Sequence, residues 1–258
     1  MSTIVAIANQ KGGVGKTTTC VNLAKNLAAA NKRVLVIDLD PQGNGLTNLL
    51  AKELISDASY NDDNPASCWG MFKSATKPQP YDAGNGLYVV ATSNQIERID
   101  MDEIYNFQDS VELIEPDVDF ILLDCPPSSR VIQHAALLTS DYLLVVTHAE
   151  PQSVNAVATI MNTMRKTQRS NPNLKVAGIV MNLLEKPATN TQKHNANELK
   201  QTYGDLIFEN NLFKTVKVTE AVSQGQSLNE YMPGHAEKFG FNAFINEFIT
   251  RVEGKENE

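Results

Sequence analysis

The sequence has few of the residues that build disulfides or metal centres. Its 258 residues include three cysteines and four histidines. The cysteines, Cys20, Cys68 and Cys125, lie far apart, so neither a disulfide framework nor a cysteine-paired metal site is expected. No apolar run reaches the length of a membrane span, and the N-terminus has no charged-then-apolar signal pattern. These absences argue against disulfide-stapled and membrane-spanning classes, and we expect a cytoplasmic protein.

Basic charge is scarce as well, with 22 lysines and arginines against 30 aspartates and glutamates and a net charge of −8. Taken alone, this balance argues against a nucleic-acid partner. The charge is unevenly placed, however, because residues 97–124 hold ten acids and one base, whereas residues 160–220 hold nine bases and five acids. The local basic excess allows two interpretations, a surface for a polyanion or an ordinary solvated face.

Short apolar runs alternate with helical patterns along the chain. This order predicts βαβ units in a three-layer α/β fold, with a mainly parallel sheet and helices on both faces. We expect a single domain over residues 1–258, with a surface excursion at 56–86 and a flexible acidic tail at 253–258. An apolar patch within the excursion, residues 67–72, is expected to form a short packed helix. The expected strands are 4–8, 34–37, 87–91, 120–123, 142–146 and 176–181.

A glycine-rich run after the first expected strand has the form of a phosphate-binding loop. It extends from Gln10 to Thr18 and ends in Gly-Lys-Thr, although Gln10 stands where the first glycine belongs. Lys16 is expected to reach the β- and γ-phosphates of a triphosphate, and the Thr17 hydroxyl to ligate Mg²⁺. Lys11 is a second lysine that the ordinary loop does not need. The expected nucleotide contacts are Gly12, Gly13, Val14, Gly15, Lys16, Thr17 and Thr18.

Three aspartates follow two further apolar strands, at the ends where open α/β sheets bind ligands. Asp38 and Asp40 come after the strand at 34–37, and their side chains are expected to diverge because Pro41 ends the strand. Asp124, after the strand at 120–123, has the form of the acid that holds Mg²⁺ in phosphate-loop enzymes. For each of the three, the alternative is a strand-end acid that caps a turn.

Together these motifs resemble the ParA/MinD family of deviant Walker-A ATPases, and specifically ParA-type partition proteins. The resemblance covers almost the whole chain. It is carried by the double-lysine loop, the DLDPQG box that begins at Asp38, the DCPP box that begins at Asp124, and the segment 216–231. It implies the P-loop fold and slow ATP hydrolysis with Mg²⁺. It further implies that Lys11 reaches across an ATP-sandwich homodimer to the partner's phosphates, while Lys16 acts in cis.

The same resemblance implies roles for the other site residues. Asp40 matches the acid that positions the attacking water, so the catalytic residues would be Lys11, Lys16 and Asp40. Thr18 matches a residue near the α-phosphate, and Asn182 matches the position that reads adenine. The residues implied to hold or support Mg²⁺ are Thr17, Asp38 and Asp124.

Two positions depart from the family pattern. Arg130 follows two serines after the DCPP box, in a stretch where relatives often carry a glycine. This difference bears on the flexibility of the loop after that box, which we expect to act as a switch beside the γ-phosphate. Phe213 stands where many relatives have proline near the base, which bears on the adenine pocket.

The resemblance also implies partners. The ATP-bound dimer would bind nonspecific DNA through phosphate contacts, which are salt-sensitive and independent of base sequence. A centromere-binding adaptor protein would stimulate hydrolysis, and the protein would associate with the bacterial nucleoid during plasmid or chromosome partition. The expected DNA contacts are Lys193, Lys200, Lys214 and Lys217.

Two alternatives share these motifs. A MinD-like regulator would cycle on a membrane through its C-terminal helix, and residues 241–252 do form an apolar stripe at helical spacing. The polar side of that stripe and the following tail are not basic, so core docking is favoured over stable membrane association. A positioning ATPase for a protein cargo is the second alternative, and the sequence does not separate it from a DNA partition ATPase.

Overall fold

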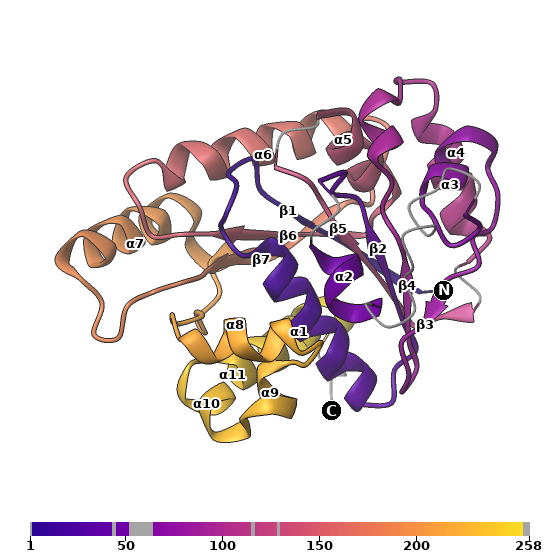
Figure 1. Cartoon of the computed structure of the whole chain (residues 1–258). Helices are drawn as coiled ribbons and strands as arrows, with labels where there is room; N and C mark the ends of the chain where they lie inside the picture. Colours follow the sequence, from indigo (N-terminus) through magenta and orange to yellow (C-terminus); the bar gives the residue numbers. More distant parts are fainter. Residues whose placement is uncertain (1, 43–44, 52–63, 115–116, 128–129, 255–258) are drawn as a thin grey trace.

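Figure 1 shows the computed structural model of the chain, which describes residues 2–42, 45–51, 64–114, 117–127 and 130–254. Several features named above lie outside the described residues, namely residue 43 of the DLDPQG box, residues 52–63 of the chain before and within the excursion, the two serines at 128–129, and residues 255–258 of the tail.

A seven-stranded sheet in the order β3-β4-β2-β5-β1-β6-β7 forms the middle layer. Neighbouring strands are parallel except for the β3–β4 pair at the edge, which is antiparallel. The six predicted strands are confirmed, and β3 is a short addition that the sequence did not predict. The strands are β1 (Thr3–Ala8), β2 (Val34–Asp38), β3 (Tyr81–Asp82), β4 (Leu87–Val90), β5 (Phe120–Asp124), β6 (Tyr142–Thr147) and β7 (Lys175–Met181).

The central strands are apolar throughout because both faces of the sheet are covered. In β1, Ile4 and Ala6 belong to one hydrophobic core, whereas Val5 and Ile7 belong to a second core on the opposite face. Successive side chains of a strand point to opposite faces, so an unbroken apolar run supplies both cores. The three-layer α/β prediction is therefore confirmed.

Two sets of helices form the outer layers, as Figure 1 shows. The first set covers the face that contains Ile4. It comprises α3 (Trp69–Ser74), α4 (Ile104–Glu112), α5 (Arg130–Thr139), α6 (Ser153–Thr167) and α7 (Asn190–Tyr203). The second set covers the other face and comprises α1 (Lys16–Ala29), α2 (Leu46–Ala51), α8 (Val216–Ser223), α9 (Leu228–Tyr231), α10 (Pro233–Lys238) and α11 (Phe241–Glu253). Short 3-10 turns lie at Asn94–Arg98 and Gly204–Leu206.

The apolar patch of the surface excursion forms α3. Met71 and Phe72 are buried, and the Phe72 ring stacks on Phe107 of α4 with 4.6 Å between ring centroids. The excursion thus contributes a helix to the core and the edge strand β3 to the sheet, although it was predicted to lie on the surface apart from this patch.

The C-terminal stripe packs into the core. Phe244 and Phe248 of α11 are buried, and Phe244 meets Phe208 edge-on with 5.1 Å between centroids. Arg251, on the same helix, stacks over Phe208 and pairs with Glu247. The structure therefore favours the core-docking interpretation of this helix. Across the described ranges, no helix combines the length and the hydropathy that crossing a bilayer requires.

Helix α1 is tied to α9 by polar contacts as well as by the core. The Asn22 side-chain oxygen accepts a hydrogen bond from the Leu228 N–H at 2.8 Å, and both residues are buried. Asn229 donates to Asn26 one turn along, and Lys25 lies 3.9 Å from Glu230. The helix that begins at the phosphate loop is therefore supported by residues two hundred positions later in the chain.

Candidate nucleotide site

The predicted phosphate loop connects β1 to α1, which is the strand-then-helix context that such loops require. Gly13 and Gly15 have positive φ angles of 73° and 91°, a region that favours glycine. Gly15 precedes the first residue of α1, so its turn directs the free N–H groups of that helix end toward the loop. A Cβ on Gly15 would lie 2.1 Å from the Asn182 amide nitrogen, so only glycine fits there.

Lys16 and Thr17 lie beside the end of β5, and their contacts with phosphate and Mg²⁺ stay predictions. Lys16 is only 7% exposed, and its Nζ is 3.5 Å from the Lys11 carbonyl oxygen. The Thr17 hydroxyl donates to Asp124 Oδ2 at 2.7 Å. The other carboxylate oxygen of Asp124 is buried and has no hydrogen-bond partner among the described residues. A buried oxygen without a partner is costly unless a ligand or water satisfies it.

Asp38 and Asp124 face each other across neighbouring strands, because β2 and β5 pair with these two residues in register. Both carboxyl groups are buried. Asp38 accepts hydrogen bonds from the Thr47 N–H at 2.9 Å, from the Thr47 hydroxyl, and from the Asp40 N–H at 3.1 Å. The capping interpretation of Asp38 is thus correct, and it does not conflict with a place beside Asp124.

These buried groups have shifted pKa values. Burial, and then the nearby Asp38 charge, raises the pKa of Asp124 to about 8, although the Thr17 hydrogen bond and the Lys16 charge oppose the shift. Burial raises the pKa of Asp38 to about 6 against the hydrogen bonds from Thr47 and Asp40. Burial also lowers the pKa of the Lys16 ammonium, which Asp124 partly offsets. With Asp38 and Asp124 both ionised, the site would hold more negative charge than Lys16 neutralises, so an added cation would stabilise the ionised form.

Asp40 diverges from Asp38, as expected from Pro41. Its carboxylate accepts the Gln42 N–H at 3.1 Å, and its carbonyl oxygen accepts the Thr92 hydroxyl at 3.0 Å. Asp40 is partly exposed, whereas Asp38 is buried, so the second aspartate of the box is the accessible one.

The donor set fits Mg²⁺ and a triphosphate. Oxygen ligands are what Mg²⁺ prefers, and the Thr17 hydroxyl with the unpartnered Asp124 oxygen would hold it, with Asp38 as a neighbouring carboxylate. The glycine turn and Lys16 would hold the phosphates. When bound, Mg²⁺ would neutralise charge on the phosphate oxygens.

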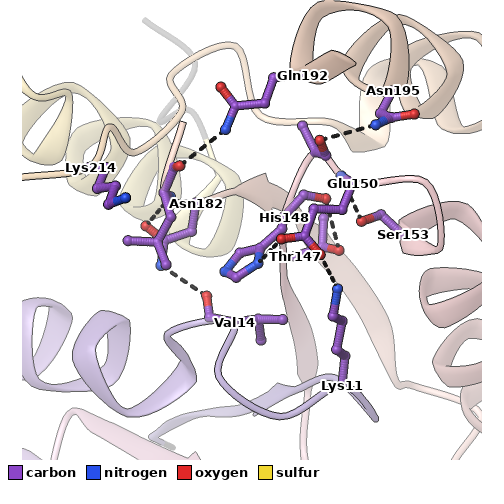
Figure 2. Close-up of polar contacts among 12 residues, drawn as sticks. Lys11, Val14, Thr147, His148, Glu150, Ser153, Asn182, Gln192, Asn195 and Lys214 are labelled. Atoms are coloured by element: carbon purple, nitrogen blue, oxygen red, sulfur yellow. Dashed lines mark hydrogen bonds and ion pairs between the residues drawn. The ribbon is translucent and has the colours of Figure 1, made fainter. Parts of the chain in front are cut away.

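The Lys11 side chain extends to the segment that follows β6. As Figure 2 shows, its ammonium pairs with Glu150, which follows β6. His148 Nδ1 lies 3.2 Å from the other Glu150 oxygen. Glu150 was not among the predicted site residues, although the rule that selected Asp38 and Asp124, an acid at the carboxyl end of a parallel strand, applies to it equally.

Asn182, the predicted adenine reader, packs against the phosphate loop. Its amide nitrogen donates to the Val14 carbonyl at 2.9 Å, as Figure 2 shows. Its oxygen accepts the Leu183 N–H at 2.8 Å. The adenine role stays a prediction.

The two residues that depart from the family pattern lie in different places. Arg130 is the first residue of α5, and the Lys186 ammonium lies over the Phe213 ring, 4.7 Å from its centroid.

The four predicted DNA lysines occupy two different settings. Lys193 and Lys200 are exposed on α7, seven residues apart, and neither has an ion-pair partner in the described part of the chain. Lys214 lies 3.1 Å from Glu185, and Lys217, in α8, lies 2.6 Å from Glu220. Among the described residues, two of the four ammonium groups therefore have no carboxylate within ion-pair distance.

Comparisons with known proteins show the family and the fold. A family model described as an AAA domain matches residues 2–176. The sporulation initiation inhibitor protein Soj of Bacillus subtilis is 30% identical over 90% of this chain and 92% of its own, and the chromosome partitioning protein ParA of Caulobacter vibrioides is 28% identical over 96% and 94%. The structure of apo McdA from Cyanothece has a TM-score of 0.82 at 20% identity, covering 96% of this chain and all of that one. An ATP complex of a McdA variant has a TM-score of 0.76 at 19% identity, covering 100% and 98%.

Proposed function

The chain belongs to the AAA-domain family that includes the ParA-type partition ATPases, and we propose that it is an ATPase that moves DNA cargo by cycling on and off nonspecific DNA as an ATP-dependent dimer. The proposed nucleotide binding rests on the hydrogen bond between Thr17 and Asp124 beside Lys16. One Asp124 oxygen is buried there and has no partner among the described residues. That arrangement suits Mg²⁺ and a triphosphate.

The direction of Lys11 supports dimer formation. Its ammonium lies at the outer side of the loop, paired with Glu150, while Lys16 occupies the inner position. A cation placed there is suited to a neighbouring subunit's phosphates rather than its own. Accordingly, ATP binding brings two subunits together, and Lys11 of each completes the other's site.

Asp40 is the proposed water-positioning residue, because it is the accessible aspartate of the pair. Replacing it should slow hydrolysis without removing the metal site at Asp124. Asp40→Ala is therefore expected to accumulate the ATP-bound dimer, which analytical ultracentrifugation would measure. A variant that stays monomeric with ATP would contradict the assignment.

DNA binding is proposed through the lysines of α7 and α8, with Lys193 and Lys200 as the stronger contacts because no carboxylate neutralises them within the described structure. An adaptor protein bound to the cargo would stimulate hydrolysis and so release the dimer from the nucleoid. Because the contacts are to phosphates, affinity should fall steeply with salt.

Co-sedimentation tests this function. The protein is mixed with ATP or ADP and with random-sequence DNA or anionic liposomes, at two salt concentrations. ATP-dependent, salt-sensitive binding to DNA is the expected result. Binding to liposomes instead would favour the membrane-cycling alternative. ATP-dependent dimerisation without DNA binding would favour an ATPase that positions a protein cargo through other contacts.

A further inference from the structure

The ion pair between Lys11 and Glu150 joins two segments that are each fixed in place. Glu150 lies in the connection between β6 and α6; its N–H donates to the Ser153 hydroxyl at 3.1 Å, and its carbonyl accepts the Ser153 N–H at 2.9 Å. The Lys11 N–H donates to Asn9 at 3.0 Å, and the Asn9 amide donates to the Val146 carbonyl at 2.7 Å. The Lys11 end of the ion pair is thus anchored to β6 and the Glu150 end to the start of α6, so the contact is built into the fold.

The pair is nevertheless accessible. The Lys11 and Glu150 side chains are 29% and 50% exposed. Lys11 also lines an open groove of about 390 Å³ with Gln152 and Asn155 at the start of α6. An exposed ion pair is worth little energy, so a stronger anion can displace the carboxylate.

We propose that Glu150 is a positioning residue that holds Lys11 in the free subunit, so that dimerisation must exchange this ion pair for the partner's nucleotide phosphates. The inference rests on the proposed trans role of Lys11. The exchange replaces one carboxylate with the denser charge of a triphosphate, and it is favourable for that reason. A diphosphate offers less charge in return. Glu150 therefore makes dimerisation discriminate between ATP and ADP.

His148 gives Glu150 a second hydrogen-bond neighbour, which remains when Lys11 leaves the ion pair. His148 Nδ1 lies 3.2 Å from one Glu150 oxygen, as Figure 2 shows, and its other ring nitrogen is buried without a hydrogen-bond partner among the described residues. Once Lys11 has turned to the partner subunit, Glu150 keeps this neighbour. The exchange then costs less than exposing an isolated carboxylate within the contact would.

The first test is the dissociation constant of the dimer in the Asp40→Ala background, where hydrolysis does not obscure the equilibrium. Glu150→Gln keeps the shape of the side chain and removes its charge. Two ion pairs open per dimer, and an exposed pair changes an equilibrium by about threefold, so the constant with ATP should fall by about tenfold. Dimer should also become detectable with ADP. Glu150→Asp should restore most of the wild-type behaviour.

A matched control is Asp117→Asn, which removes the carboxylate from another exposed ion pair, with Lys77, remote from the loop. It should leave both dissociation constants unchanged. If Glu150→Gln instead weakens the ATP dimer, Glu150 contributes directly to the dimer contact, and the holding role is wrong.

A second measurement does not depend on dimerisation. Acetylation of lysines in the nucleotide-free protein, followed by mass spectrometry, reports how freely each ammonium reacts. Lys11 should be labelled several-fold faster in Glu150→Gln, while Lys25 of α1 should be labelled at the same rate in both proteins. Unchanged labelling of Lys11 would refute the ion pair even if Lys11→Ala abolishes dimerisation. A Lys11→Ala protein that dimerises normally would instead refute the proposed trans role, together with the ATP discrimination derived from it.

Discussion

The proposed function depends on two regions that differ most in burial. One is the nucleotide site at the phosphate-loop end of the sheet. The other is the lysine surface, which contains Lys193, Lys200, Lys214 and Lys217. At the loop, Asp124 and Asp38 are buried and Lys16 is nearly so, and their contacts have definite partners. The four lysines of this surface, two on α7, one on α8 and Lys214 just before α8, are exposed or half-exposed, and two are paired with carboxylates. A buried charge costs free energy unless a partner or ligand balances it, so the buried groups at the loop need a ligand. An exposed lysine is hydrated by water and has no need of one.

The comparison explains why the nucleotide site is well defined and the DNA surface is not. A buried oxygen without a partner indicates what is missing, whereas an exposed ammonium fits water as well as it fits a phosphate. Experiments at the loop should therefore give large effects, and experiments on the lysines small and graded ones.

The largest effect is expected from Lys16→Ala. The ammonium is buried beside Asp124 and cannot be replaced by a neighbouring surface lysine, so the ATPase rate should fall by about a hundredfold or more. Steady-state phosphate release measures it. Lys77→Ala, which removes an exposed lysine outside the loop and α1, is the control and should retain activity. An unchanged rate in Lys16→Ala would remove the loop from the site.

The buried carboxylates predict a pH dependence of stability in the nucleotide-free protein. The native pKa of Asp124 is raised to about 8 by burial and by Asp38, above its ordinary value of 3.8. The native state therefore holds a proton that the unfolded chain has already released. This contribution is fully present below about pH 4 and is lost as the pH rises toward 8, with a slope of about 1.4 kcal/mol per pH unit for one proton.

Urea unfolding between pH 6 and 8 would measure this slope. The free energy of unfolding should fall across that window, and Asp124→Asn should flatten the dependence. Saturating Mg²⁺ and ATP should also flatten it, because a bound cation favours the ionised carboxylate. A slope that is identical in Asp124→Asn would show that another group titrates.

The contact between the loop and Asn182 predicts a difference between two glycines. Both glycines have positive φ angles, so alanine at either position introduces backbone strain of about 1–3 kcal/mol. A Cβ on Gly15 would also lie 2.1 Å from the Asn182 amide nitrogen, whereas a Cβ on Gly13 meets no atom of the described residues within 4 Å, so Gly15→Ala should be destabilised by more than Gly13→Ala. Adding Asn182→Ala should recover part of the loss in Gly15→Ala only. Equal destabilisation of the two alanine variants would exclude the close contact.

The smallest effects are expected on the lysine surface. Lys193→Glu and Lys200→Glu should each weaken DNA binding several-fold and reduce the salt slope by about one. Lys217→Glu should weaken it less, since Glu220 already neutralises much of that charge. Fluorescence anisotropy over a salt series measures both quantities, and dimerisation with ATP should be unchanged. Lys77→Glu is the control. If Lys217→Glu has the largest effect, α8 rather than α7 is the main DNA contact.

The sequence predicted the strands and the loop because both depend on local signals. Buried parallel strands require unbroken apolar runs, and a phosphate loop requires glycines next to Lys16 and Thr17. The edge strand β3 was not predicted because a two-residue strand has no periodicity. It exists through its pairing with β4, which the local sequence does not encode.

Residues that act through tertiary contacts were the harder part of the site. Thr47, which donates twice to Asp38, lies in α2 and has no motif of its own. Glu150 had a usable signal in its place after β6, but its partner Lys11 is 139 residues away, and spacing alone does not join them. The DNA-contacting lysines were predicted from the local basic excess and the family resemblance, and neither shows which of them already have a carboxylate neighbour.

The contacts between α1 and α9 bear on how future variants should be interpreted. Asn229 and Glu230 lie beyond the residues that the family model matches, yet they contact Asn26 and Lys25 of the helix that begins at the phosphate loop. A substitution at either position that lowers ATPase activity would act by removing a contact that supports that helix. Genetic screens that place loss-of-function changes near the C-terminus should therefore measure nucleotide affinity before assigning the region to a partner protein.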